Sequence, residues 1–347
     1  MRVAVDVTPL HGTVTGVGMS VRGLLSALPD AAPDVEVLPY LLARRATKVP
    51  AGVLVRLWAK GDFVGGDRFV PAAAEVVHGT NFVVPPVARP STLTVHDCWC
   101  AREPGRCPPV VEAAVQTVQR AVERGAWLHV TTEWGAEEVR EVYGAERVRV
   151  VPLGVPPVPP AGPPPIDGRY VLALSTIEPR KGHVSLVRAF AAMAGEHPEL
   201  KLVLCGADGP ALPDVEREIE KADLGERVVR LPYVDDDTRA ALLRGAWLLA
   251  QPSLYEGFGI TPLEAMSVGV PVVATDAGAV SEVVGDAAVV VPVGDDDALA
   301  DAIVRVAMSE DLQHDLVTKG HDRAALYSWE RMARGMADLW RMALHES

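Results

Sequence analysis

The sequence predicts an α/β protein built from two Rossmann-like domains that face a central cleft. Short apolar runs alternate with amphipathic helical segments through both halves of the chain. The stretch 156–165 contains seven prolines, which makes it a stiff, extended linker between the halves. A chain of 347 residues is long enough for two domains. We expect an N-terminal domain over 1–155, a linker over 156–167, a C-terminal domain over 168–325 and a final helix over 326–347.

Composition restricts the class of protein. The formal net charge of −13 argues against a protein that coats nucleic acid. No apolar run approaches the roughly twenty residues that a membrane span needs. Met1-Arg2 leads directly into an apolar strand rather than a signal peptide. We therefore expect a cytoplasmic protein with no nucleic-acid partner.

The N-terminal half opens with a strand and a glycine-containing turn. The strand is VAVDV over 3–7, and Gly12, Gly16 and Gly18 then precede an amphipathic helix. Such a turn suits a phosphate, because a helix start carries unpaired N–H groups. The spacing is not G-x-G-x-x-G, so an ordinary tight turn is the simpler explanation of these residues alone.

The segment 41–60 inverts the charge of the chain locally. It holds five basic side chains and no acidic one. A basic amphipathic segment can contact an anionic acceptor or a membrane surface. The alternative is an exposed helix face that is basic without a partner.

A further strand, STLTVHDCW, ends in a histidine. His96 and Asp97 stand at its carboxyl end, and histidine is the side chain best suited to proton chemistry near neutral pH. His78 and Asn81 are weaker candidates for lining the cleft. A single histidine at a strand end is, by itself, explained by a structural role.

Three cysteines lie close to this histidine. Cys98, Cys100 and Cys107 form C-x-C-x6-C, which is not a standard zinc spacing. We expect reduced thiols in a loop rather than a metal site. Cys205 lies in the apolar run KLVLCG and is expected to be a small core residue.

The C-terminal half begins with the strand YVLALST, which is followed by a charged turn, EPRKG. Arg180 and Lys181 thus lie beyond the carboxyl end of a strand, where open α/β sheets bind ligands. A solvated charged turn is the alternative explanation.

The densest pattern is SLYEGFGITPLEAMSVGVPVVAT, over 253–275. Its glycines allow a ligand to approach the main chain closely. Thr261 is expected to be the N-cap of a helix with Pro262 at N1, and such a helix start suits an anion. By spacing alone, Glu264 could be a capping-box carboxylate and Glu256 a solvated loop charge.

Two aspartate runs resemble D-x-D metal motifs. They cover 235–237 and 295–297, and each precedes an amphipathic helix. Aspartate at this position supplies an N-cap and interacts favourably with the helix dipole. We therefore interpret both runs as helix starts rather than metal sites.

The motifs together resemble a known family. EGFGITPLE resembles the E-x7-E signature of retaining glycosyltransferases with the GT-B fold, that is, family 4 or "glycosyl transferases group 1". EPRKG, the His96-Asp97 strand end and the segment Gly16-Val17-Gly18 resemble further motifs of that family. The resemblance covers nearly the whole chain and implies a final helix that crosses back onto the N-terminal domain. One departure is Ser175-Thr176, where some members have Gly-Arg.

The resemblance implies a role for each matching residue. Glu256 and His96 would lie beside the donor sugar, Glu264 would bind the ribose hydroxyls, and Arg180 with Lys181 would hold the donor diphosphate. The implied catalytic residues are His96, Glu256, Arg180 and Lys181. The implied donor-binding residues are Gly16, Val17, Gly18, Gly206, Tyr233, Gly257, Phe258, Gly259, Ile260, Thr261 and Glu264.

The implied activity is hexosyl transfer from a nucleotide diphosphate sugar to a glycan, lipid-linked or small-molecule acceptor. GDP-mannose is the expected donor, with UDP- and dTDP-sugars as alternatives, and no metal or other cofactor is expected. A GT-B-like epimerase or phosphorylase is a second hypothesis. A non-catalytic nucleotide-sugar-binding subunit is the third.

Overall fold

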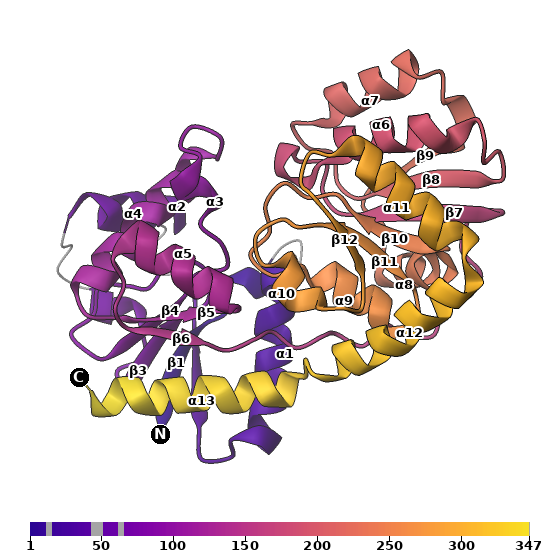
Figure 1. The fold of residues 1–347 in the computed structure, drawn as a ribbon. Coiled ribbons are helices and arrows are strands. Elements are labelled where there is room, and N and C mark those ends of the chain that lie inside the picture. Colours follow the sequence, from indigo (N-terminus) through magenta and orange to yellow (C-terminus); the bar gives the residue numbers. More distant parts are fainter. Residues whose placement is uncertain (12–15, 43–50, 62–65, 347) are drawn as a thin grey trace. The chain divides into compact units, whose positions relative to one another are not determined.

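A computed structural model of the protein describes residues 1–11, 16–42, 51–61 and 66–346. The chain divides into two compact units. The first comprises 1–156 together with 327–347, and the second comprises 157–326. Among the described residues, each unit has one six-stranded sheet with helices on its faces (Figure 1).

The first unit contains the N-terminal strands and helices and the last helix of the chain. Its elements are β1 (Arg2–Asp6), η1 (Thr8–Leu10), α1 (Gly16–Ala31), β2 (Glu36–Tyr40), α2 (Ala51–Lys60), η2 (Gly66–Phe69), β3 (Val76–Gly79), β4 (Ser91–Thr94), α3 (Trp99–Arg102), α4 (Pro109–Glu123), β5 (Trp127–Val130), α5 (Glu133–Tyr143), β6 (Val148–Val150) and α13 (Trp329–His345).

The second unit repeats the alternation of strand and helix. Its elements are β7 (Arg169–Leu174), η3 (Pro179–Lys181), α6 (His183–Ala194), β8 (Leu200–Cys205), α7 (Leu212–Lys221), η4 (Gly225–Arg227), β9 (Val228–Leu231), α8 (Asp236–Gly245), β10 (Leu248–Gln251), α9 (Ile260–Ser267), β11 (Val272–Thr275), α10 (Val280–Val284), β12 (Val289–Val291), α11 (Asp296–Met308) and α12 (Glu310–Ala325).

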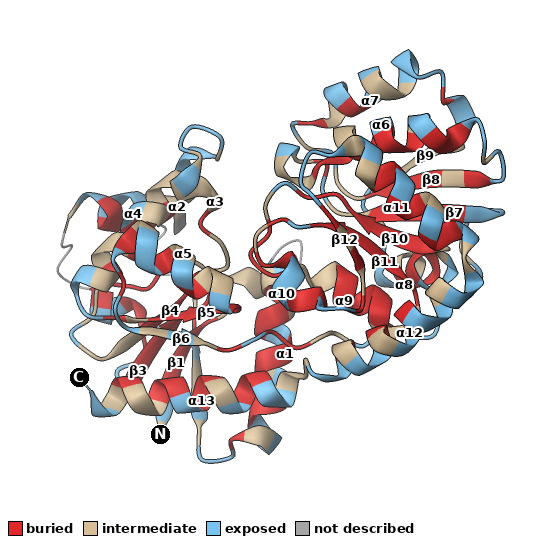
Figure 2. Cartoon of the chain, viewed as in Figure 1, coloured by how far each residue is buried: buried red, intermediate tan, exposed pale blue. Residues whose placement is uncertain are grey.

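Both sheets are parallel, and most of their strands are buried (Figure 2). Parallel strands covered by helices on both faces become continuous apolar runs, which explains why VAVDV and YVLALST lack polar alternation. In the first sheet Val3 pairs with Val37 on one side and with Val76 on the other.

The strand order of each sheet identifies its ligand-binding edge. The second sheet runs β12-β11-β10-β7-β8-β9, and the first runs β2-β1-β3-β4-β5-β6. The direction of chain progression therefore reverses between β7 and β10 in the second sheet, and between β1 and β3 in the first. Ligands of open α/β sheets bind beyond the carboxyl ends of the strands at this reversal.

The last helix packs against the first unit, as expected from the resemblance. α13 lies against α1 and the neighbouring strands. The indole of Trp329 occupies space left by two glycines: a Cβ on Gly23 or Gly154 would lie 2.3 or 2.4 Å from it. Trp340 on the same helix is fully buried.

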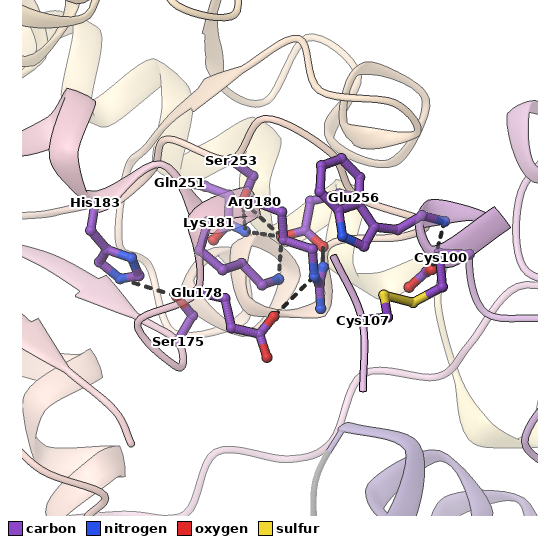
Figure 3. A network of polar contacts seen from close by, with 12 residues as sticks. Cys100, Cys107, Ser175, Glu178, Arg180, Lys181, His183, Gln251, Ser253 and Glu256 are labelled. Atoms are coloured by element: carbon purple, nitrogen blue, oxygen red, sulfur yellow. Dashed lines mark hydrogen bonds and ion pairs between the residues drawn. A yellow bond between two sulfur atoms is a disulfide. The ribbon is translucent and has the colours of Figure 1, made fainter. Parts of the chain in front are cut away.

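The expectation of reduced thiols near His96 is wrong for two of the three cysteines. Cys100 and Cys107 form a disulfide (Figure 3). The short helix α3 and the turn after it bring their Cα atoms to 5.8 Å, within the range of a disulfide. Cys98 and Cys205 are buried free thiols, and the core position of Cys205 in β8 is confirmed.

Only part of the basic segment 41–60 can be placed. Residues 43–50, with three of its five basic side chains, lie outside the described residues. The remainder forms α2, which carries Arg56 and Lys60 and exposes Val53 and Leu57. No helix in the described part of the chain is long and apolar enough to cross a membrane.

Candidate functional site

The two charged motifs of the C-terminal half form one site in the second unit. The EPRKG turn follows β7, and the SLYEGFG loop follows β10, the strand next to it. The N–H of Leu254 donates to the carbonyl of Arg180 at 2.7 Å. Gly182 has φ of 69°, and a Cβ there would lie 1.8 Å from the carbonyl oxygen of Pro252. Only glycine therefore permits this close approach of turn and loop.

Glu256 lies at the centre of this site (Figure 3). Its side chain is only 8% exposed. Oε1 accepts hydrogen bonds from Lys181 Nζ at 2.5 Å, Gln251 Nε2 at 2.7 Å and Ser253 Oγ at 2.8 Å. The alternative of a solvated loop charge is therefore wrong.

Two cations keep the Glu256 carboxylate ionised. Burial alone would raise its pKa, but the charges of Lys181 and Arg180 outweigh burial and lower the pKa below its usual value. Arg180 Nη1 lies 3.8 Å from Glu256 Oε2, and Arg180 Nε lies 3.0 Å from Glu178 Oε2. The turn therefore is not simply solvated, because both basic side chains are ion-paired.

The helix after this loop starts earlier than predicted. α9 begins at Ile260 with Gly259 as its N-cap, so Thr261 lies in the first turn and is not the cap. Gly259 has φ of 85°, a left-handed conformation that glycine adopts readily because it has no Cβ. Within the described residues no side chain caps this helix, so its first N–H groups remain suited to an anion. Phe258, just before the cap, is buried.

Glu264 is not a capping-box residue, because the earlier start places it a full turn inside α9. Its side chain is fully buried, and Oε2 lies 2.5 Å from Nη2 of Arg239 on α8. Burial raises its pKa, although Arg239 opposes this effect. Oε1 has no hydrogen-bond partner among the described residues. Such a buried acceptor costs about 1–3 kcal/mol unless a ligand donates to it.

Two further predicted contacts lie at the same edge of the second sheet. Gly206 follows β8, and a Cβ there would lie 2.1 Å from the carbonyl oxygen of Ser175. Tyr233 follows β9 and is 58% exposed. Gly206 and Tyr233 therefore lie at the carboxyl edge of the second sheet, the same edge that carries Glu256 and Lys181.

The aspartate runs are helix starts, as predicted. Asp235 accepts from the N–H of Thr238 at 2.8 Å at the start of α8. Asp295 accepts from the N–H of Ala298 at 2.9 Å at the start of α11. Across the described ranges, no group of three His, Cys, Asp or Glu side chains could hold a metal ion.

In the first unit, His96 lies beyond the end of β4. Its Nε2 is 3.0 Å from the carbonyl oxygen of Thr80, which can only accept, so Nε2 carries the hydrogen. Burial lowers the pKa of His96, which favours a neutral ring with Nδ1 as an acceptor. Asp97 accepts from the N–H of Trp99 at 3.0 Å and thus orients local backbone at the start of α3.

His78 is a core residue and not a cleft candidate. It is fully buried, its Nδ1 lies 2.8 Å from Thr92 Oγ1, and its ring contacts that of Trp340. Burial lowers its pKa to about 3. His129 on β5 is held similarly, and burial lowers its pKa to about 4. Asn81 is half-buried.

The glycine turn near the N-terminus differs from the prediction. Gly16, Val17 and Gly18 do not precede the helix but form the first turn of α1. Gly16 is exposed and Gly18 is buried. Gly12 lies outside the described residues.

Three site residues were not predicted from the sequence. Gln251 and Ser253 bind Glu256, and their polarity at the end of the apolar run WLLAQPS was an available signal. Arg239 binds Glu264 from a separate helix, and nothing in the sequence pattern connects the two.

Comparison with known proteins supports the same class. The family described as Glycosyl transferases group 1 matches residues 160–323. "D-inositol 3-phosphate glycosyltransferase" of Nocardia farcinica is 30% identical over 99% of this chain and 89% of the relative. "O-antigen chain mannosyltransferase B" of Escherichia coli is 28% identical over 74% of this chain and 71% of the relative. "Phosphatidyl-myo-inositol mannosyltransferase" of Mycolicibacterium smegmatis is 34% identical, but the match spans only 50% of that relative.

Solved structures share the fold. Sucrose-phosphate synthase from Thermosynechococcus elongatus matches with a TM-score of 0.78 at 21% identity, over 100% of both chains. Anabaena Alr3699/HepE in complex with UDP-glucose matches with a TM-score of 0.74 at 18% identity, over 97% of this chain and 98% of that chain. The fold is therefore GT-B, and the chain belongs to the glycosyl transferases group 1 family of glycosyltransferases.

Proposed function

We propose that this glycosyltransferase retains anomeric configuration and moves a hexose from a nucleotide diphosphate sugar to an acceptor hydroxyl. The observation that carries the proposal is the ion-paired cluster of buried Glu256 with Lys181 and Arg180. It lies where the strand order of the second sheet reverses, the position at which open α/β sheets bind their ligands.

The diphosphate of the donor would bind to the cations and the helix start. The Lys181 ammonium has three N–H donors, and Glu256 accepts one of them. Arg180 adds a second cation, and the first N–H groups of α9, at Ile260 and Thr261, add donors near the positive end of a helix dipole. These groups would stabilise the negative charge that develops on the departing diphosphate. The proposal therefore needs neither a metal nor another cofactor.

The reaction would take place on one face of the donor sugar. The bond from the anomeric carbon to the phosphate oxygen breaks, and the acceptor oxygen bonds to that carbon on the same side. The departing phosphate takes the acceptor proton. Configuration is retained because the acceptor oxygen bonds to the face that the phosphate leaves. The ionised Glu256 would stabilise the positive charge that develops on the sugar ring, and Nδ1 of neutral His96 would accept from a sugar hydroxyl.

The nucleoside would bind at the other end of the same sheet edge. Oε1 of Glu264, which has no hydrogen-bond partner in the described part of the chain, would accept from ribose hydroxyls. The main chain at Gly206 and the exposed Tyr233 would border the base. The loop Gly257–Gly259 would lie along the sugar and phosphates.

Mannose is the proposed sugar and GDP-mannose the first donor to test. Two of the compared relatives carry mannosyltransferase in their names. UDP- and dTDP-sugars belong in the same experiment, since the HepE structure contains UDP-glucose. The acceptor would be a hydroxyl of a glycan, a lipid-linked compound or a small molecule, and the relatives' names include O-antigen chains and inositol phosphates.

A donor screen tests the proposal. The protein is incubated with GDP-, UDP- and dTDP-sugars, with and without EDTA, and release of the nucleoside diphosphate is measured. We expect slow hydrolysis of one donor that is insensitive to EDTA and is lost in Glu256→Ala. Glu218→Gln is the matched control, because Glu218 forms a surface ion pair with Arg188. It should keep full activity.

Other outcomes identify the alternatives. A requirement for free phosphate, or a product without a new glycosidic bond, would indicate a phosphorylase or an epimerase. Binding without turnover, even with a library of acceptors, would indicate a nucleotide-sugar-binding subunit. Loss of activity in EDTA that Mg²⁺ restores would contradict the metal-free mechanism.

We also propose peripheral membrane contact through α2. This helix exposes Val53 and Leu57, each 43%, on the same helix as Arg56 and Lys60. Exposed apolar side chains beside basic ones suit an anionic lipid surface. Co-sedimentation with anionic but not zwitterionic vesicles is expected, and Leu57→Glu should abolish it. Val293→Glu, which changes a similarly exposed residue of the second unit, should not. Equal sedimentation of both variants would contradict the proposal.

A further inference from the structure

We infer that Arg239 is a positioning residue for the donor nucleoside. In this inference, its guanidinium holds one oxygen of the Glu264 carboxylate so that the other oxygen is presented to the ribose hydroxyls. The inference rests on the proposed function, and within it assigns a second residue to ribose recognition.

The backbone of Arg239 is held in the first turns of α8. Asp235 caps this helix through the N–H of Thr238, and the N–H of Arg239 donates to the carbonyl of Asp235 at 2.9 Å. The side chain extends to α9, where Nη2 lies 2.5 Å from Oε2 of Glu264. The arginine side chain is 23% exposed, whereas that of the glutamate is 1% exposed. The pair thus links α8 to α9.

The geometry of the pair leaves one carboxylate oxygen unused. Arginine and a carboxylate often pair through two parallel hydrogen bonds, which satisfy both oxygens. Here Arg239 contacts Oε2, and in the described part of the chain Oε1 of Glu264 has no hydrogen-bond partner. An ion pair that served only the fold would gain by engaging both oxygens. The single contact therefore points to a ligand that donates to Oε1, and because this oxygen is covered in the structure, the ligand reaches it once the covering atoms shift.

The ligand class follows from the chemistry of the unused atom. An ionised carboxylate oxygen only accepts hydrogen bonds, so the partner must be a donor. The two neighbouring hydroxyls of a ribose are such donors, whereas a deoxyribose lacks one of them. Arginine suits the supporting role because it stays charged at all relevant pH values. It thus opposes the effects of burial and of the neighbouring negative charge of Asp236, although burial still raises the pKa of Glu264.

A purely structural role for Arg239 makes a different prediction. If the ion pair only fastened α8 to α9, its loss would weaken the binding of every nucleotide by the same factor. If Arg239 presents Glu264 to the ribose, its loss should affect ribonucleotides far more than their 2′-deoxy forms. The ratio of the two affinities therefore separates the two roles.

The experiment measures calorimetric binding of GDP, 2′-deoxy-GDP, UDP and 2′-deoxy-UDP to the full chain. For the nucleotide that binds best, the unaltered protein should prefer the ribose form by about 10-fold or more. In Arg239→Met the ribonucleotide affinity should fall by about 10- to 100-fold and approach that of the deoxy form. Arg239→Lys, which restores a charge without the planar guanidinium, should recover part of the preference. Arg244→Met is the matched control, since Arg244 on the same helix donates to the carbonyls of Val158 and Pro159.

Each outcome supports or overturns the inference. An equal loss for both sugars in Arg239→Met, or the same loss of preference in Arg244→Met, overturns it. If Glu264→Gln abolishes the preference while Arg239→Met retains it, the inference fails and the proposed role of Glu264 stands. If Glu264→Gln retains the preference, or no nucleotide binds, the proposed function itself fails at this site. Should Arg239→Met not fold, Arg239→Lys carries the test, and an unchanged preference there overturns the inference.

Discussion

Buried polar groups at the carboxyl edges of the two sheets are stabilised in different ways. In the second unit, each buried carboxylate is paired with a cation: Glu256 pairs with Lys181, and Glu264 pairs with Arg239. In the first unit the histidine at the strand end is neutral and donates to a carbonyl oxygen.

The difference follows from the cost of burying charge. A buried ion needs a partner of opposite charge, whereas imidazole can lose its proton instead. Asp6, at the end of β1 in the first unit, shows the same cost of burying charge: burial raises its pKa to about 6 despite hydrogen bonds from Thr8. The charges around Glu256 are the reason that the proposed function assigns the donor diphosphate to the edge of the second sheet.

Removing the central charge should have the largest effect. Glu256→Gln keeps the shape of the side chain but removes the carboxylate that would stabilise the sugar cation, and it leaves Lys181 without its counter-ion. We expect turnover to fall by about 10³-fold. Release of nucleoside diphosphate at saturating donor measures it. A loss below about threefold, as small as any loss in Glu218→Gln, would contradict the proposed role of the Glu256 charge.

Lys181→Ala should act mainly on the chemical step. Charge on the diphosphate is greater in the transition state than in the bound donor, so kcat should fall by about 10²-fold while the donor KM changes much less. Initial rates over a range of donor concentrations separate the two constants. An unchanged kcat with a raised KM would assign Lys181 to ground-state binding alone. Thermal unfolding of the variant serves as the control for folding.

Acid should destabilise the first unit more than the second. Burial lowers the pKa of His78 to about 3 and of His129 to about 4 in the first unit, and of His183 to about 4 in the second. These folded-state pKa values lie below the unfolded value of 6.5. The contribution of the neutral histidines to the free energy of unfolding is therefore complete above pH 6.5 and is lost as the pH falls toward 4. Each histidine should cost about 2 kcal/mol at pH 5. Asp6 works in the opposite direction and offsets part of the loss.

Urea unfolding at pH 7.5 and pH 5 measures this effect. Trp247 is the single tryptophan of the second unit, so total tryptophan fluorescence reports mainly on the first. Trp247→Phe removes the signal of the second unit entirely. Equal stability at the two pH values would show that the buried histidines do not titrate as described.

The smallest expected effect concerns the helix that carries Arg239. Asp235→Ala removes the N-cap of α8 and should lower the free energy of unfolding by about 1 kcal/mol. Asp237→Ala, which changes an aspartate in the first turn, should cost less, about 0.3–1 kcal/mol. Denaturant unfolding compares the two. A larger loss in Asp237→Ala would contradict the cap assignment.

From the amino-acid pattern alone, the α/β class could be predicted, and each charged motif could be placed beyond the carboxyl end of an apolar strand. The adjacency of β7 and β10, which brings Lys181 to Glu256, could not be predicted from that pattern, because the two strands are not consecutive in the chain. The family motifs assigned the same residues. Asp235 and Asp295 were predictable as caps because capping depends on only a few adjacent residues.

The partners of the buried groups depend on how the whole chain packs and not on local sequence. Arg239 reaches Glu264 because the fold brings the start of α8 within reach of α9, a proximity that no local pattern encodes. The start of α9 at Gly259 depends on how the loop leaves β10, although Thr261 has the better local capping propensity. The Cys100–Cys107 disulfide likewise depends on the turn after α3. Local chemistry specifies elements and caps, whereas partners across the fold follow from packing, which is a property of the whole chain.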